Sequence, residues 1–295
     1  MAIPELPRRN LLLAGVASVA GVAALAAGCA SQTGSTRSTG PSIGPVADHD
    51  PVSPAPSAGT ADPAAEASRA TVPVLCYHQI RAWAGGDSSY NKNSLICPPD
   101  NFRRQLDGIK DAGFTTITPD AYLAHLRTNA PLPDKPVMLS FDDGKDSQPN
   151  VAAPELTKRG MTGTFFIMSV VIDKPGWITS KQVADLAAAG HTVGSHTYDH
   201  HDVRKYAGKD WEEQFVKPRD VLRKLSGQPV ETFAYPYGAW NAAAFPHLAQ
   251  AGYTTAYQLG DKPVDAANPL FTLRRILVNS RLDGAGIVAE LTKKP

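Results

Sequence analysis

The sequence predicts a parallel α/β barrel built by one domain. From Thr71 onward, seven or eight short apolar segments alternate with segments of helical periodicity, a pattern typical of parallel strands joined by helices. This region, Thr71–Pro295, has about 225 residues, which fits a one-domain barrel better than two domains. An open doubly wound sheet is the alternative, but no glycine-rich phosphate loop follows any of the predicted strands.

The predicted strands are short apolar runs separated by turn residues. In chain order they are Val72–Tyr77, Thr115–Thr118, Val137–Phe141, Thr164–Met168, Thr192–Ser195, Thr232–Tyr235, Thr254–Tyr257 and Leu273–Val278.

The predicted helices carry apolar residues at helical spacing, and most of them end at a glycine. Thr118 is predicted to cap one helix whose first residue is Pro119. In chain order the helices are Asp100–Ala112, Pro119–Thr128, Val151–Arg159, Ser180–Ala189, Lys209–Leu225, Ala242–Ala251 and Gly286–Leu291.

Residues 1–29 have the features of an export signal that ends in a lipid-modified cysteine. The pair Arg8-Arg9 precedes the uncharged run Leu11–Ala27, which is short for a transmembrane helix and ends in small residues. Leu25–Cys29 resembles the lipobox of bacterial lipoproteins, in which acyl chains on the cysteine (here Cys29) bind the membrane. The arginine pair also resembles a twin-arginine export motif. An uncleaved anchor helix and plain secretion are the alternatives, and all three place the domain outside the cytoplasm.

Residues 30–70 are predicted to form a flexible tether between the anchor and the domain 71–295. After Cys29 the segment consists largely of Ser, Thr, Gly, Pro, Ala and Asp, and it contains no aromatic residue, Leu or Met. Such a composition buries too little apolar surface to offset the entropy of ordering. The alternative is a short and marginal helix over Pro63–Ala70.

The overall composition excludes several classes of protein. The formal net charge is +1, from 29 basic and 28 acidic residues, and no block of like charge is present. This argues against a nucleic-acid-binding protein. Three cysteines are too few for a disulfide-dense scaffold or a four-cysteine zinc ribbon.

Ionisable side chains follow several predicted strands. The carboxyl ends of parallel strands meet at one rim, so these side chains are expected to converge. Asp142 and Asp143 follow one strand, and His196 and His200 follow another. If the loop after the second strand enters a helical turn, the two imidazoles share a face. Two imidazoles and one carboxylate form a common catalytic zinc site, and the remaining carboxylate is then available as a base.

These residues resemble the ordered motifs of the polysaccharide deacetylases, the NodB-homology family or carbohydrate esterase family four. The start of the domain is similar to the poly-N-acetylglucosamine deacetylase-like branch. The matching segments are Pro73–Ile80, Ser140–Gly144, His196–His200 and Tyr235–Gly238. The resemblance extends from Thr71 to about Ser280 and implies a distorted (β/α)7-type barrel, a divalent metal, and hydrolysis of acetyl groups on sugars.

The resemblance also implies roles for individual residues. Asp142 would be the general base and Asp143, His196 and His200 the metal ligands. The backbone N–H of Tyr237 would face the developing oxyanion. Zn2+ is the expected metal, and Co2+ or Ni2+ are accepted by the same ligands. His201 is the alternative to His200, because related enzymes can use its spacing from His196.

The sequence departs from the family pattern at two positions. Many members have a base-orienting arginine where Ala234 stands, and Arg275 is the expected replacement, with Arg274 as the alternative. Many members also supply the acid from a histidine where Asn279 stands. His78 is the expected replacement, because its strand ends on the same rim.

Aromatic and cysteine residues complete the predicted site. Tyr235, Tyr237 and Trp240 are the candidates to contact sugar rings, and packing in the core or at the rim is the alternative for each of them. Cys76 and Cys97 are expected to form a disulfide, which the export compartment permits, and free buried cysteines are the alternative.

The sequence therefore predicts a lipid-anchored, metal-dependent enzyme at the cell envelope that removes N-acetyl groups from an N-acetylglucosamine-containing polysaccharide. The first alternative is an O-acetyl esterase acting on xylan or a similar sugar. The second is a catalytically inactive glycan-binding lipoprotein, which the changes at Ala234 and Asn279 motivate. Neither the oligomeric state nor the export route follows from the sequence.

Overall fold

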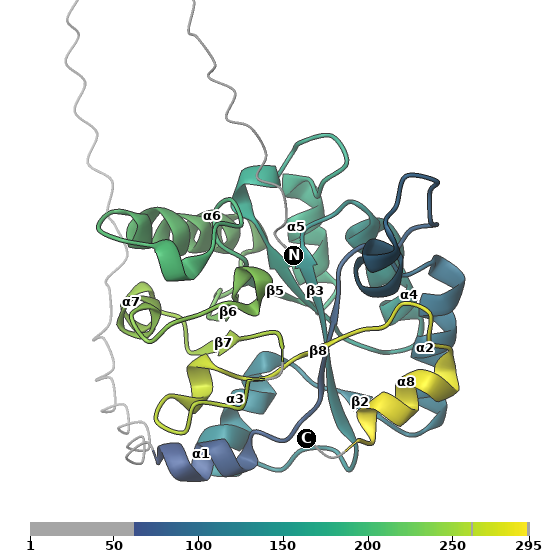
Figure 1. Cartoon of the computed structure of the whole chain (residues 1–295), viewed down its shortest axis with the longest axis horizontal. Helices are drawn as coiled ribbons and strands as arrows, with labels where there is room; N and C mark the ends of the chain where they lie inside the picture. Colours follow the sequence, from purple (N-terminus) through teal and green to yellow (C-terminus); the bar gives the residue numbers. More distant parts are fainter. Residues whose placement is uncertain (1–61, 261, 294–295) are drawn as a thin grey trace, which may run out of the picture. The chain divides into compact units, whose positions relative to one another are not determined.

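The computed structural model describes residues 62–260 and 262–293, and these belong to one compact unit, Pro56–Pro295. Its strands are parallel and form a curled sheet in the order β7-β6-β5-β4-β3-β1-β8, with β2 paired to β3 (Figure 1). The strands are β1 Val74–Tyr77, β2 Thr115–Thr116, β3 Pro136–Asp143, β4 Thr164–Ile167, β5 Thr192–Ser195, β6 Thr232–Ala234, β7 Thr255–Tyr257 and β8 Ile276–Leu277.

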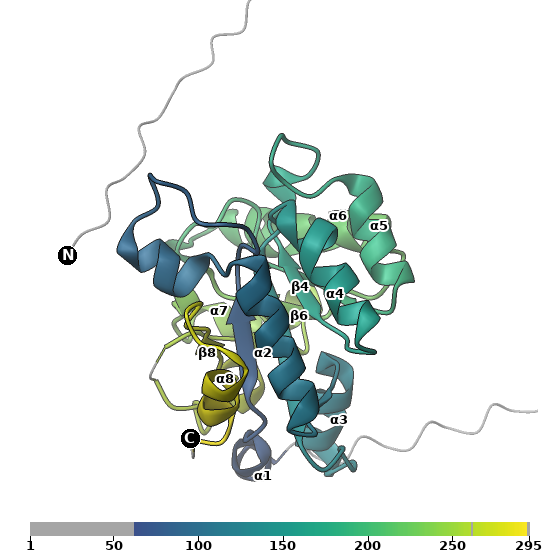
Figure 2. The same ribbon diagram turned by 90° about the vertical axis from the view of Figure 1, so that its right-hand side faces the viewer.

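Helices lie along the outside of the curled sheet, where α2, α4 and α5 follow one another (Figure 2). Helix α2 packs against α8, and α5 packs against α6. The helices are α1 Pro63–Arg69, α2 Pro99–Asp111, α3 Pro119–Thr128, α4 Ala153–Lys158, α5 Ser180–Ala188, α6 Lys217–Ser226, α7 Ala244–Ala251 and α8 Gly284–Leu291.

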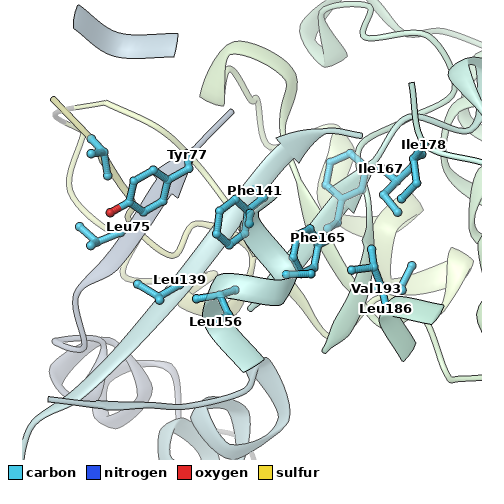
Figure 3. Packing of buried hydrophobic residues seen from close by; sticks show 14 of the residues in the cluster. Leu75, Tyr77, Leu139, Phe141, Leu156, Phe165, Ile167, Ile178, Leu186 and Val193 are labelled. Atoms are coloured by element: carbon cyan, nitrogen blue, oxygen red, sulfur yellow. The ribbon is translucent and has the colours of Figure 1, made fainter. Parts of the chain in front are cut away.

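Alternate residues of the central strands face two different cores. The outward residues pack under the helices, and the rings of Tyr77, Phe141 and Phe165 form a row across β1, β3 and β4 (Figure 3). The ring centroids in this row are 5.4 and 4.8 Å apart. The inward residues include Met138 and Phe166, which belong to a second cluster inside the barrel. Because the side-chain period of a strand is two, the inward positions of β3 continue through Ser140 to the buried carboxylate of Asp142.

The barrel closes through a single short pairing. Tyr257 at the end of β7 pairs with Leu273, and the Leu273 N–H donates to the carbonyl of Ala256 at 3.1 Å. The chain then crosses to β1, where Ile276–Leu277 forms β8. The predicted strand Leu273–Val278 is therefore wrong as one continuous strand, because its two ends pair with opposite edges of the sheet. Arg275 lies at the crossing between them. The result is the distorted barrel that the sequence predicts.

Two predicted helices begin with a turn of π-helix. Gln148–Ala152 precedes α4, and Glu212–Val216 precedes α6. Each following α-helix has a proline near its start, Pro154 or Pro218, which has no N–H to continue the regular ladder. The other predicted helices agree with the structure to within two residues at each end.

The folded region begins before Thr71, so the predicted extent of the tether is wrong at its end. Asp62 accepts hydrogen bonds from the N–H groups of Ala64 and Ala65 and caps helix α1. The Arg69 guanidinium donates to the carbonyl of Leu126 on α3 at 2.7 Å. A cap, a proline at the first helical position and a contact to α3 thus stabilise a helix too short to persist alone. The signal, Cys29 and the rest of the tether lie outside the described residues.

Candidate active site

The carboxyl end of β3 carries two aspartates that occupy different positions. Asp142 continues the inward face of the strand and is 2% exposed. Asp143 has a left-handed backbone, with φ of 84°, and is followed by Gly144 with φ of 82°. This turn ends the strand alternation, so both carboxylates lie at the same rim. Outside glycine such a conformation is uncommon and concentrates at functional sites.

The two histidines after β5 are brought together by a turn and not by a helix. Thr197 and His200 have left-handed φ values of 68° and 67°, and the His200 N–H donates to Thr197 Oγ1 at 3.0 Å. The structure does bring the two rings together, with their centroids 4.8 Å apart. The helical turn expected to bring them together is wrong.

Three side chains converge at this rim. Asp143 Oδ1 lies 3.6 Å from the Nε2 atoms of both His196 and His200, and the three ligand atoms lie within 4.8 Å of one another. The Asp143 and His200 side chains are 21% and 24% exposed, so the cluster opens toward the outside. His201 does not join it, since its side chain is 75% exposed and pairs with Asp199 at 3.0 Å.

Both imidazoles are in the neutral form that can bind a metal. His196 Nδ1 donates to the carbonyl of Ala234 at 2.8 Å, which leaves Nε2 unprotonated and directed at Asp143. Burial lowers the pKa of His196, and burial followed by repulsion from His196 lowers the pKa of His200 to about 4. Two neutral imidazoles and one carboxylate match the donors that zinc takes in catalytic sites, with a fourth position left for water or substrate.

Arg275 and Asp142 form a fully buried ion pair. Two nitrogens of the guanidinium donate to the two carboxylate oxygens at 2.6 and 2.8 Å. Burial acts to raise the pKa of Asp142, but Arg275 and His196 outweigh it and hold that pKa well below its usual value. Arg274, the alternative partner, is exposed.

Phe166 and Gly194, on the inward face of β4 and β5, support this ion pair. The guanidinium lies 5.4 Å from the centroid of the Phe166 ring. A Cβ atom at Gly194 would approach that ring to 2.6 Å, so only glycine leaves room for the ring in this position. The packing of Phe166 on Gly194 therefore helps to position the Arg275 guanidinium beside Asp142.

His78 follows β1 at the same rim, and a buried amide holds its backbone. Gln148 Nε2 donates to the carbonyls of both His78, at 2.9 Å, and Asp142, at 2.5 Å. Gln148 is fully buried, and its Oε1 has no hydrogen-bond partner among the described residues. One side chain thus ties the end of β1 to the end of β3.

The predicted disulfide between Cys76 and Cys97 is wrong, because the two thiols are free and lie on opposite faces of β1. Cys76 faces inward, and its thiol donates to Asp142 Oδ2 at 3.5 Å. Cys97 lies on the outward side, where its thiol is 3.7 Å from Gln105 Oε1. Tyr77, the neighbour of Cys76 that points outward, donates to that same amide oxygen.

The motif after β6 contributes one exposed aromatic ring. Tyr237 has φ of 59°, is 61% exposed, and lies with its ring centroid 4.5 Å from that of His200. Its backbone N–H has no acceptor among the described residues. Trp240 is half-buried, and its indole N–H donates to Gln258 at 2.9 Å. Tyr235 is fully buried, and its hydroxyl donates a hydrogen bond to the carbonyl of Phe271. Its predicted contact with sugar is therefore wrong.

Sequence reasoning missed the positions of Gln148 and Cys76 in this site. The inward alternation Val74, Cys76 along β1 could have placed the thiol beside the base. Gln148 had no such signal, because it lies in a π-helical turn that the helical pattern did not resolve.

Comparisons with known proteins identify the class. Residues 129–256 match the family model described as polysaccharide deacetylase. A deacetylase from Streptococcus pyogenes, PplD, solved with acetate, has 25% identity and a TM-score of 0.69 over 76% of this chain and 99% of its own. Residues 129–256 therefore form a polysaccharide deacetylase domain of the NodB type, a class of hydrolases that act on N-acetyl groups of polysaccharides.

Two curated relatives give the extent of the likeness. A putative polysaccharide deacetylase of Bacillus subtilis, YxkH, is 24% identical over 220 residues, which is 75% of this chain and 76% of the relative. A peptidoglycan-N-acetylglucosamine deacetylase of Bacillus cereus is 30% identical over 104 residues, and the chain spans only 36% of its length.

Proposed function

We propose that the protein is a metal-dependent deacetylase that removes N-acetyl groups from an N-acetylglucosamine-containing polysaccharide of the cell envelope and releases acetate. The observation that carries this proposal is the convergence of Asp143, His196 and His200 beside the buried Asp142–Arg275 pair. A relative that acts on peptidoglycan N-acetylglucosamine, and a similar structure that holds acetate, support the substrate class and the product.

In this proposal Asp143, His196 and His200 hold a divalent metal, with Zn2+ as the expected ion and Co2+ or Ni2+ as substitutes. When bound, such an ion supplies Lewis acidity, which polarises the acetyl carbonyl and lowers the pKa of water. The Ala234 carbonyl fixes the tautomer of His196 and so keeps its Nε2 available as a ligand.

Asp142 acts as the general base. It takes a proton from the attacking water while the water oxygen bonds to the acetyl carbon. Arg275 keeps this carboxyl ionised. Arg275 takes one lone pair of each carboxylate oxygen, and Oδ2 also accepts the weak S–H of Cys76 at 3.5 Å, so the water would take the place of that weak donor.

The Tyr237 N–H and His78 complete the reaction. The N–H has no acceptor within residues 62–260 and 262–293, so it is available to donate to the oxyanion that replaces the carbonyl. As the C–N bond breaks, the amine nitrogen leaves with a proton donated by His78, and acetate remains. The exposed face of Tyr237 and the partly exposed Trp240 are available to sugar rings.

The proposed location is the outer face of the cytoplasmic membrane. It rests on the predicted signal at 1–29, with lipid on Cys29, and on a tether that ends where α1 begins. Among the described residues, no helix is long and apolar enough to cross a membrane.

Acetate release from N-acetylglucosamine oligomers tests the proposal. The full chain is assayed after chelation and again after Zn2+ is returned, with acetylated xylan as a second substrate. Release that chelation abolishes and zinc restores is expected from the oligomers. Release from xylan alone would favour the esterase, and no release from either by the zinc-loaded protein would favour a binding protein.

Asp142→Asn separates the two aspartates. We expect the variant to retain bound metal and to lose turnover by about 10²–10⁴-fold, the usual contribution of a general base. Loss of the metal instead would mean that the roles of Asp142 and Asp143 are exchanged.

A further inference from the structure

A second cluster of metal-ligating side chains lies beside the first. Cys76, His78 and Asp142 each offer one ligand atom, and these atoms lie within 4.8 Å of one another. The Cys76 sulfur is 3.5 Å from Asp142 Oδ2 and 4.0 Å from His78 Nδ1. None of the three belongs to the Asp143–His196–His200 cluster.

The separation between Cys76 and Asp142 matches the edge of a tetrahedral site. With a Zn–S bond of about 2.3 Å and Zn–O or Zn–N bonds of about 2.0 Å, sulfur and the lighter ligand atoms lie about 3.5 Å apart. The Cys76–Asp142 separation already has this value, whereas His78 Nδ1 lies 4.0 Å from the sulfur and would have to approach it by about 0.5 Å. The donors, one sulfur, one nitrogen and one oxygen, suit a thiophilic divalent ion.

We propose that Cys76, His78 and Asp142 form a second metal site, which takes Zn2+ or Cd2+ and inhibits the enzyme when it fills. The binding itself is independent of catalysis. The inhibition rests on the proposed function, because an ion here occupies an oxygen of the base and the ring of the acid at once. Binding releases the thiol proton to solvent and joins sulfur to the metal.

Electrostatics make this second site the weaker of the two. Arg275 donates to both oxygens of Asp142, so its charge opposes a cation at that carboxylate. The Cys76 thiol is fully buried and must lose its proton. In the Asp143–His196–His200 cluster, Asp143 and His200 are partly exposed, and no ion pair between Arg275 and Asp143 is found among the described residues. Zinc is therefore expected to restore activity to the chelated enzyme at low concentration and to inhibit it at higher concentration.

Cys97 provides a matched control, since it is also a buried free thiol but contacts Gln105 on the other face of β1. The test uses the full chain as wild type, Cys76→Ser, Cys76→Ala and Cys97→Ser, with Cys29 retained in all four. Bound metal is counted by equilibrium dialysis against Zn2+, and the ultraviolet thiolate-to-metal absorption band is recorded with Cd2+.

We expect two bound ions and a Cd2+–thiolate band in the wild type and in Cys97→Ser, and one ion with no such band in both Cys76 variants. The zinc concentration for half-inhibition should rise roughly tenfold or more in the Cys76 variants, because oxygen or a methyl group replaces the soft sulfur ligand. One ion in the wild type, or a band that survives Cys76→Ala, would overturn the proposal.

The two proposals fail separately in this experiment. A Cys76-dependent band in a protein that releases no acetate would support the second site and contradict the proposed function. Chelation-sensitive hydrolysis by a protein that binds one ion would do the reverse.

Discussion

The buried ion pair between Arg275 and Asp142 gives the sharpest prediction for stability. Arg275→Met replaces the guanidinium by an uncharged side chain of similar length and leaves Asp142 ionised and without its two short hydrogen bonds. Asp142→Asn leaves the guanidinium buried without its counter-charge. The double variant Asp142→Asn/Arg275→Met leaves no charge in this position.

The magnitude follows from complete burial of both groups. At a charge separation of about 4 Å and an effective dielectric constant of about 20, their attraction is about 4 kcal/mol. Removing one partner of a buried pair usually costs about 3–5 kcal/mol, because the other charge stays desolvated. Replacing both partners by neutral groups is often close to neutral. We therefore expect each single variant to lose about 3–5 kcal/mol and the double variant to lose less than either.

The assay is urea unfolding of the full chain after chelation, at about pH 8, where neither a bound cation nor a protonated His196 compensates the carboxylate. The coupling energy comes from the wild type, both single variants and the double variant. If the losses of the two single variants sum to the loss of the double variant within about 0.5 kcal/mol, the reasoning is refuted. Groups that do not interact are additive to that degree.

Three further predictions concern other residues. Gln148→Leu removes both hydrogen bonds to the carbonyls of His78 and Asp142, and we expect steady-state kinetics to show kcat reduced by about 10- to 100-fold with KM little changed; an equal rise in KM would mean that the residue affects binding. Burial lowers the pKa of His191, so its contribution to stability is present above about pH 6.5 and is lost as the pH falls toward the folded-state value. His191→Gln should flatten the free energy of unfolding against pH in that range, and an unchanged slope would contradict this. Cys29→Ser should move the protein from the membrane fraction to the soluble fraction of cells, and unchanged partitioning would argue for an anchor other than lipid.

The sequence predicted the barrel and the convergence of the Asp and His side chains because both depend on local patterns. Short apolar runs alternate with helical segments that end at a glycine, and this pattern indicated the order of the elements. The carboxyl ends of parallel strands then had to lie at one rim. Asp142, Asp143, His196 and His200 therefore had to lie at the same rim of a parallel sheet. The left-handed turns at Asp143 and His200, which decide how the atoms meet, leave no trace in hydrophobic periodicity.

Long-range features were harder to predict. Arg275 and Asp142 are 133 residues apart, and their pairing depends on where the last strand crosses the gap in the barrel. Cys76 and Cys97 form no disulfide because their thiols lie on opposite sides of β1. Their spacing along the chain gave no information on this. Helix α1 forms because α3 provides a partner, which its own composition does not reveal.

The claim that Asp143, His196 and His200 form the catalytic metal centre is tested most directly by a pair of adjacent variants. His200→Gln removes a ligand whose Nε2 lies 3.6 Å from Asp143, whereas His201→Gln changes an exposed neighbour. Zinc content and acetate release from N-acetylglucosamine oligomers are measured on the same preparations of the full chain. We expect His200→Gln to lose both and His201→Gln to keep both. The opposite result would contradict the account and assign the site to His201.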